Sequence, residues 1–211
     1  WRSIDSMKEG RGVFESVIPQ IAADPNVLKE YALLLFELAN SQYRAGNRDE
    51  ARQIYESSLA AYDQLRKAEP DSLDYEVRWA QVARTLGSSI RRQDGKRSHE
   101  LFESSRAAFE EVLNHRHQDT TTNVQYAETC RVLGIYRLNH DIDGALDIFN
   151  RGIDALNQAL ANEPTNLTFI DSLATLYREI ATYHAKKGEP RDRLAALSQA
   201  RQLWERVDGT I

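Results

Sequence analysis

The side chains best suited to recognition chemistry are three arginines spaced 47 residues apart, Arg84, Arg131 and Arg178. A guanidinium offers a carboxylate two parallel N–H donors, so aligned arginines are typical of a surface that holds acidic groups. The same arginines can instead pair with glutamates of their own chain, and their aliphatic stems would then cover neighbouring helices. The nearby acids are Glu37, Glu128 and Glu179. The sequence leaves both interpretations open.

Motifs for catalysis and cofactor binding are absent from the sequence. It contains no phosphate-binding glycine loop, no His-Glu-x-x-His motif and no cysteine pair at metal-ligand spacing. Cys130 lies on the apolar side of an amphipathic stretch, which predicts a buried thiol rather than a nucleophile. His115 and His117 would diverge on a helix, which favours an exposed helix end over a metal site. We therefore expect no catalytic residues, metals or cofactors here, although a larger parent protein could be an enzyme such as a kinase.

Composition limits the classes of partner. The 211 residues carry a formal charge of −5, which argues against a nucleic-acid surface, and no apolar run is long enough for membrane insertion. A single cysteine fits a reducing compartment, so we expect a cytoplasmic protein. The chain opens with Trp1 rather than Met and has no signal peptide, which indicates a piece of a longer protein.

Internal repetition predicts the architecture. The octapeptide YESSLAAY at 55–62 returns as FESSRAAF at 102–109. Long amphipathic stretches with apolar residues three and four positions apart predict an all-α chain. A second set of landmarks recurs every 47 or 48 residues: Leu38-Ala39, Leu86-Gly87, Leu133-Gly134 and Ile180-Ala181. A register held over four repeats argues against chance similarity between helices.

The order of Leu-Gly, then Ala-x3-aromatic, then proline at Pro70 and Pro164 resembles the tetratricopeptide repeat (TPR), a helix–turn–helix repeat. That repeat usually takes about 34 residues, whereas here each helix is about seven residues longer, which extends the same apolar face by nearly two turns. The long period is similar to TPR arrays attached to bacterial serine/threonine kinases and other signalling proteins. HEAT and armadillo repeats are the architectural alternative.

The resemblance implies a right-handed α-solenoid of antiparallel helix pairs, forming a single domain. The expected repeats cover 1–22 (a partial repeat or cap), 23–70, 71–118, 119–164 and 165–211. The expected helix pairs are 26–45 with 48–68, 72–93 with 96–115, 120–139 with 142–162, and 167–187 with 190–207. The expected N-caps are Asp71, Thr120 or Thr121, and Thr165 or Asn166. At one register position, close helix packing is expected for Ser58, Ser105 and Gly152.

In the TPR fold the first helix of each pair faces a concave groove. The resemblance places ten residues on that face: Phe36, Asn40, Tyr43, Arg44, Arg84, Arg91, Arg92, Arg131, Arg178 and Lys186. It implies a non-catalytic scaffold within a larger bacterial signalling protein, such as a serine/threonine kinase. The scaffold would bind an acidic protein or peptide segment, from a partner or from the same polypeptide. The alternative is a structural element that spaces domains or forms a homodimer through the helix at 190–207, which carries Trp204.

Overall fold

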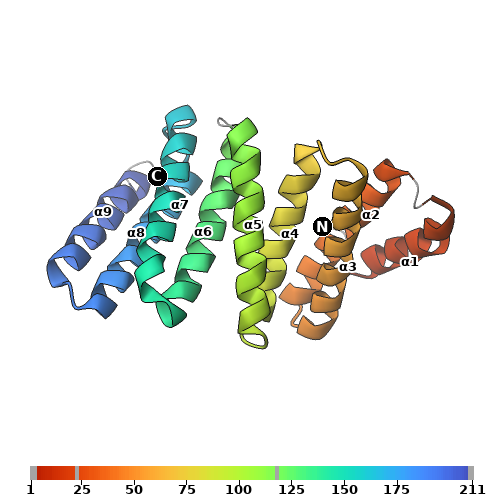
Figure 1. Ribbon diagram of the computed structural model, residues 1–211, viewed down its shortest axis with the longest axis horizontal. Coiled ribbons are helices and arrows are strands. Elements are labelled where there is room, and N and C mark those ends of the chain that lie inside the picture. The colour runs from red at the N-terminus through yellow and green to blue at the C-terminus, as the bar shows by residue number, and fades with distance from the viewer. Residues whose placement is uncertain (1–3, 22–23, 117–118, 209–211) are drawn as a thin grey trace. The chain divides into compact units, whose positions relative to one another are not determined.

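The computed structural model describes residues 4–21, 24–116 and 119–208. These residues contain helices and no strand, so the predicted all-α class is confirmed (Figure 1). The helices are α1 (Ile4–Ile21), α2 (Pro25–Arg44), α3 (Arg48–Ala68), α4 (Leu73–Ile90), α5 (Gly95–His115), α6 (Thr120–His140), a short 3-10 helix η1 (Ile142–Gly144), α7 (Ala145–Asn162), α8 (Leu167–Lys187) and α9 (Pro190–Asp208).

Consecutive helices pack as antiparallel pairs joined by short turns (Figure 1). The pairs α2–α3, α6–α7 and α8–α9 have the most extensive contacts, and α3 packs on α4 as α7 packs on α8. Helix α5 is tied to α4 by the Ser98 hydroxyl, which donates to the Gly87 carbonyl at 2.8 Å. The predicted helix pairs are confirmed to within three residues at each end, which means that period and breakers alone located the turns.

The chain forms two compact units, unit 1 (Trp1–Ala108) and unit 2 (Phe109–Ile211), and each has its own core. In unit 1 the aromatic residues of the second helices, Tyr55 and Phe102, are at most 1% exposed. Phe149 takes the same place in unit 2 and is fully buried. A Cβ on Gly134 would collide with the Phe149 ring, which explains the glycine of the Leu-Gly landmark. The repeated sequence pattern is therefore a packing pattern.

The small residues of the octapeptides also pack. Ser58 is buried and donates to the Ala32 carbonyl at 2.8 Å, and Ser105 makes the same bond to Ala80 at 2.8 Å. Gly152 takes this position in unit 2, where a Cβ would lie 3.1 Å from neighbouring side chains. The predicted close approach of helices at this register position is confirmed, and the hydroxyls satisfy helix carbonyls.

One predicted N-cap in unit 2 is wrong. Helix α6 is capped by Asp119 and not by Thr120 or Thr121. The Asp119 carboxylate accepts from the Thr122 amide at 3.1 Å and from the Thr122 hydroxyl at 2.8 Å. A full negative charge at a helix N-terminus is favoured over a hydroxyl by the aligned peptide dipoles, and the helix begins one residue after it.

Of the other two predicted N-caps, one is wrong and one is confirmed. Helix α4 is preceded by Ser72, whose side chain makes no capping bond, rather than by the predicted Asp71. Asn166 caps α8 as predicted and accepts from the Thr168 amide at 3.1 Å. Turn geometry decides this, because only a residue in extended conformation directly before the first helical residue can reach back to the free amides.

The residues set aside as unreactive lie where the sequence predicted. Cys130 is fully buried, and His115 is exposed at the end of α5, with Nδ1 2.9 Å from the Glu111 carbonyl oxygen. His117 lies outside the described residues. Among the described helices, none is sufficiently long and apolar to cross a bilayer.

Candidate interaction site

A small hollow in unit 1 brings together part of the predicted groove. Its lining is Asn40, Tyr43, Arg44, Tyr55, Thr85, Ser88 and Ser89, around a volume of about 150 Å³. Helices α2 and α4, the first helices of two successive pairs, supply its walls, and Tyr55 of α3 supplies a phenol. Three of the ten predicted groove residues therefore meet in one place.

Hydrogen bonding fixes the polar groups of this hollow. The Tyr55 hydroxyl donates to Asn40 Oδ1 at 2.7 Å, and burial raises the pKa of that phenol, so it remains a donor. Tyr43 is 39% exposed, and the Arg48 guanidinium lies 5.9 Å from the centre of its ring. Arg44 is exposed at the end of α2. The hollow presents an amide, a ring and a guanidinium to solvent.

The remaining predicted residues of unit 1 lie outside the hollow. Phe36 is only 7% exposed and packs in the core, 6.0 Å from the Tyr55 ring. Arg84 is half-buried on α4, and Arg91 and Arg92 are exposed just beyond its last turn. Of the two aromatic side chains predicted on this face, only Tyr43 is therefore accessible to a partner.

The predicted residues of unit 2 make contacts within the chain. Arg131 donates to both carboxylate oxygens of Glu128 at 2.8 Å and lies 3.8 Å from Glu179. The hydrogen bond to Glu128, more than any other contact, raises the pKa of Arg131. Arg178 is largely exposed but lies 3.6 Å from Glu179. The internal pairing that the sequence left open thus occurs at Arg131.

Lys186, the last of the ten, stabilises the end of α6. Its Nζ donates to the Leu138 carbonyl at 3.1 Å and to Asn139 Oδ1 at 2.9 Å. A cation at a helix C-terminus is favoured by the helix dipole, so this contact has a structural role.

Unit 2 contains a larger hollow that the sequence analysis missed. It encloses about 430 Å³, and its lining comes from the end of α5 and from α6 and α7: Glu110, Leu113, Asn114, Asn123, Tyr126, Arg151, Asp154, Ala155 and Gln158. The Tyr126 hydroxyl donates to Glu110 Oε1 at 2.6 Å, and Arg151 Nη1 lies 3.2 Å from the same oxygen. A spacing of 41 residues between acid and arginine could have found it, because Glu56 and Arg97 repeat that spacing and pair at 3.1 Å.

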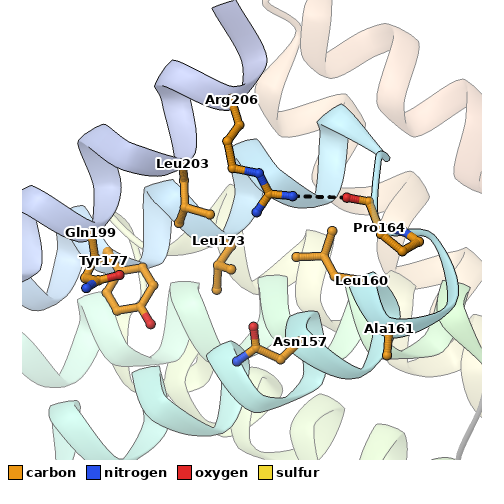
Figure 2. Close-up of a pocket in the computed structure, with 9 residues that line it drawn as sticks. All are labelled: Asn157, Leu160, Ala161, Pro164, Leu173, Tyr177, Gln199, Leu203 and Arg206. Carbon is orange, nitrogen blue, oxygen red and sulfur yellow. Dashed lines mark hydrogen bonds between the residues drawn. The ribbon is translucent and has the colours of Figure 1, made fainter. Parts of the chain in front are cut away.

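A second hollow of unit 2, of about 390 Å³, lies among α7, α8 and α9 (Figure 2). Leu160, Leu173 and Leu203 point into it, with Tyr177 at one side. Arg206 reaches across its edge and donates to the Pro164 carbonyl at 3.2 Å. Asn157 and Gln199 are other polar residues there, and none of the described residues that line it carries a carboxylate. The two hollows therefore differ in charge, because the previous one is lined by two carboxylates and this one by none among its described residues.

Comparison with known proteins rests on structure. No protein-family model matches the sequence, and no curated protein is similar to it. A thermophilic TPR protein from Thermus thermophilus matches over 95% of this chain and 84% of its own, with a TM-score of 0.51 and 17% sequence identity. The chain has a TPR fold. MamA from Desulfovibrio magneticus RS-1 also matches, over 94% of this chain and 95% of its own, at a TM-score of 0.46 and 12% identity.

Within the TPR helices that are described, one group has the donor types of a metal site: His184, Glu189 and Asp192, whose ligand atoms lie within 4.8 Å of one another. His184 Nδ1 lies 2.7 Å from Glu189 Oε2 across the turn between α8 and α9. That turn passes through Gly188 at a φ of 75°, and the Glu189 amide donates to the His184 carbonyl. A contact between the His184 and Glu189 side chains that closes the helix end accounts for this arrangement.

Proposed function

We propose that the chain is a non-catalytic interaction scaffold that binds a segment of another protein, or of its own polypeptide, beside the first helices of unit 1. The observation that carries this proposal is the hollow in which Asn40, Tyr43 and Arg44 of α2 face Ser88 of α4. A concave place with a few convergent polar groups is typical of a binding site. Because α2 and α4, which both pack on α3, supply those groups, binding requires no folding of the site.

The segment that suits this surface is acidic. Arg44 lines the hollow, and Arg91 and Arg92 are exposed beyond the end of α4, so unit 1 offers several guanidinium groups. Guanidinium–carboxylate pairs steer association and weaken as salt screens them. Arg84 remains a predicted member of this surface, whereas Arg131 is held by Glu128.

Capture of a fluorescent hexapeptide of alternating aspartate and glutamate tests the proposal. At low salt we expect Arg44→Gln to weaken binding by roughly fivefold or more, because one charge-assisted hydrogen bond is lost. Arg201→Gln, which removes an exposed arginine of α9, is the matched control and should bind like the unaltered chain. Equal binding by the Arg44→Gln protein would remove this site from consideration.

The wider context is also a proposal. We place the scaffold in a larger bacterial signalling protein, such as a serine/threonine kinase, because its 47-residue period resembles the TPR arrays of such proteins. The reading frame that encodes these residues tests the context. A kinase or other signalling domain in the same polypeptide would support it, and a frame that encodes only TPR helices would contradict it.

Self-association is a second candidate function, favoured by the outer surface of α9. Leu194 is 67% exposed and Leu197 37% exposed there. Trp204, the residue expected to mediate contact, instead donates through Nε1 to Asp171 at 3.0 Å and is held against α8. Sedimentation velocity over a range of concentrations should reveal a dimer that Leu194→Glu abolishes. A sedimentation coefficient independent of concentration would exclude this function.

A further inference from the structure

The 430 Å³ hollow of unit 2, called here the hollow over Tyr126, corresponds to a position in unit 1 that a side chain already fills. Tyr126 stands 47 residues after Trp79, the large residue at the same place of the preceding first helix. In unit 1 the guanidinium of Arg66 lies 4.1 Å from the centre of the Trp79 ring. Its Nη2 also donates to Glu76 Oε1 at 2.8 Å. An arginine stacked on an aromatic ring and paired with a carboxylate therefore occupies this position in unit 1.

Unit 2 has the same position without the arginine. Leu113 stands 47 residues after Arg66, and the shorter side chain leaves the volume of about 430 Å³ above Tyr126 open. Asn123 likewise replaces Glu76, so the carboxylates come from other helices: Glu110 from α5 and Asp154 from α7. Tyr126, although only 6% exposed, lines the hollow together with two carboxylates, and a leucine stands where unit 1 has its cation.

The charge balance of this hollow favours a cation. Glu110 and Asp154 line it, and Arg151 is the one basic residue among the described residues of its lining. Arg151 also pairs with a third acid, Asp147, at 3.0 Å, and that hydrogen bond raises its pKa. Arg151 thus pairs with Glu110 and Asp147, whereas Asp154 lines the hollow as a further carboxylate. Asp154 is exposed at the surface, where an incoming cation can reach it.

We propose that the hollow over Tyr126 binds an arginine side chain of a partner protein, in the place that Arg66 takes in unit 1. The incoming guanidinium contacts the part of the Tyr126 side chain that lines the hollow and pairs with the exposed carboxylate of Asp154. Arginine is favoured over lysine because its planar group can stack and pair at the same time. This surface differs in position and in charge preference from the acidic-segment site proposed at Arg44.

The hollow of Figure 2 is the internal control for this inference. It lies one repeat further along, with Leu173 in the place of Tyr126 and Leu160 in the place of Leu113. Tyr177 lines this hollow from another position, but the described lining carries no carboxylate, so a guanidinium has no acid to pair with there. The proposal therefore predicts binding at one hollow of unit 2 and none at its neighbour.

The test uses the blocked peptide acetyl-Gly-Gly-Arg-Gly-Gly-amide and its citrulline analogue, which has the same shape without the charge. In ¹H–¹⁵N NMR spectra of the whole chain, we expect saturable shifts of the backbone amides around Tyr126 and Asp154 with the arginine peptide only. Equal shifts with the citrulline peptide, or shifts confined to the Arg44 hollow or the hollow of Figure 2, would overturn the proposal.

Two test variants and one matched control variant test the proposal further. Leu113→Arg should supply the missing arginine from within, as Arg66 does, and so abolish peptide binding, while Leu160→Arg is the matched control and should leave binding unchanged. Asp154→Asn alters an exposed residue that tolerates change, and it should weaken binding by roughly fivefold. A folded Leu113→Arg protein that binds like the unaltered chain would contradict the proposal. So would unchanged binding by the Asp154→Asn protein.

Discussion

Units 1 and 2 contain equivalent helix pairs, but they differ in the side chain that lies beside one repeated aromatic residue. In unit 1, Arg66 covers Trp79 and pairs with Glu76, so the space beside that ring is closed from within. In unit 2, Leu113 leaves that space open above Tyr126. A repeat can therefore keep its packing while changing the chemistry of a surface position, because the core and the surface depend on different residues of the same helix.

The buried aromatic position that recurs in the core of each unit should give the largest effect. Phe149 is fully buried, and we expect Phe149→Ala to lower the free energy of unfolding by about 3–4 kcal/mol through lost burial and a cavity. Urea denaturation followed by circular dichroism measures this. A loss below about 1 kcal/mol would mean that the aromatic residue of the repeat does not support unit 2 as the packing indicates.

Replacing residues of unit 1 with those that unit 2 carries should lower the free energy of unfolding by less than Phe149→Ala does. Arg66→Leu removes the stacking on Trp79 and leaves the mostly buried Glu76 carboxylate unpaired, which should lower stability by about 2 kcal/mol. Adding Glu76→Asn, the residue that unit 2 carries at Asn123, should restore part of that loss. Denaturation of the two single variants and the double variant gives the coupling, and additive effects would show that the pair does not act together.

The small-residue position allows a finer comparison. Ser105→Ala removes a buried hydroxyl bond to Ala80 and should lower stability by about 1 kcal/mol. Gly152→Ser, the reciprocal change, adds atoms where a Cβ already lies 3.1 Å from its neighbours, and should also destabilise. Thermal melts of both proteins check this, and a Gly152→Ser protein as stable as the parent would show that unit 2 can relax there.

The smallest effect appears only at high pH. Burial raises the pKa of Tyr62 from 10.0 to about 12, so the folded state holds this proton more tightly than the unfolded state. The contribution of this pKa difference to the free energy of unfolding is complete below pH 10 and is lost as the pH rises toward 12. About 1 kcal/mol of stability is lost by pH 11. Phe109 fills this position 47 residues later and does not titrate. Tyr62→Phe should flatten the stability profile between about pH 9 and 11, and an unchanged slope would contradict this assignment.

Sequence alone determined the helices and their pairing, because period, breakers and large apolar residues act within a single helix or across one turn. It also predicted the buried Cys130 and the packing of Ser58 and Ser105, since register fixes which side of a helix faces its partner. The sequence predicted the N-caps less accurately, as Asp119 shows, because a shift of one residue in the turn changes which side chain caps the helix.

Only the tertiary structure decided which surface residues are accessible. The arginines of the predicted groove look alike in sequence, yet Arg131 is held by Glu128 and Glu179 while Arg44 lines a hollow. The 41-residue spacing of Glu110 and Arg151 could indicate an ion pair beside Tyr126, but the open space there depends on side-chain length at Leu113 and on side chains from α5, α6 and α7 together. Helix periodicity is a local property, whereas a pocket is formed by the side chains of several helices at once.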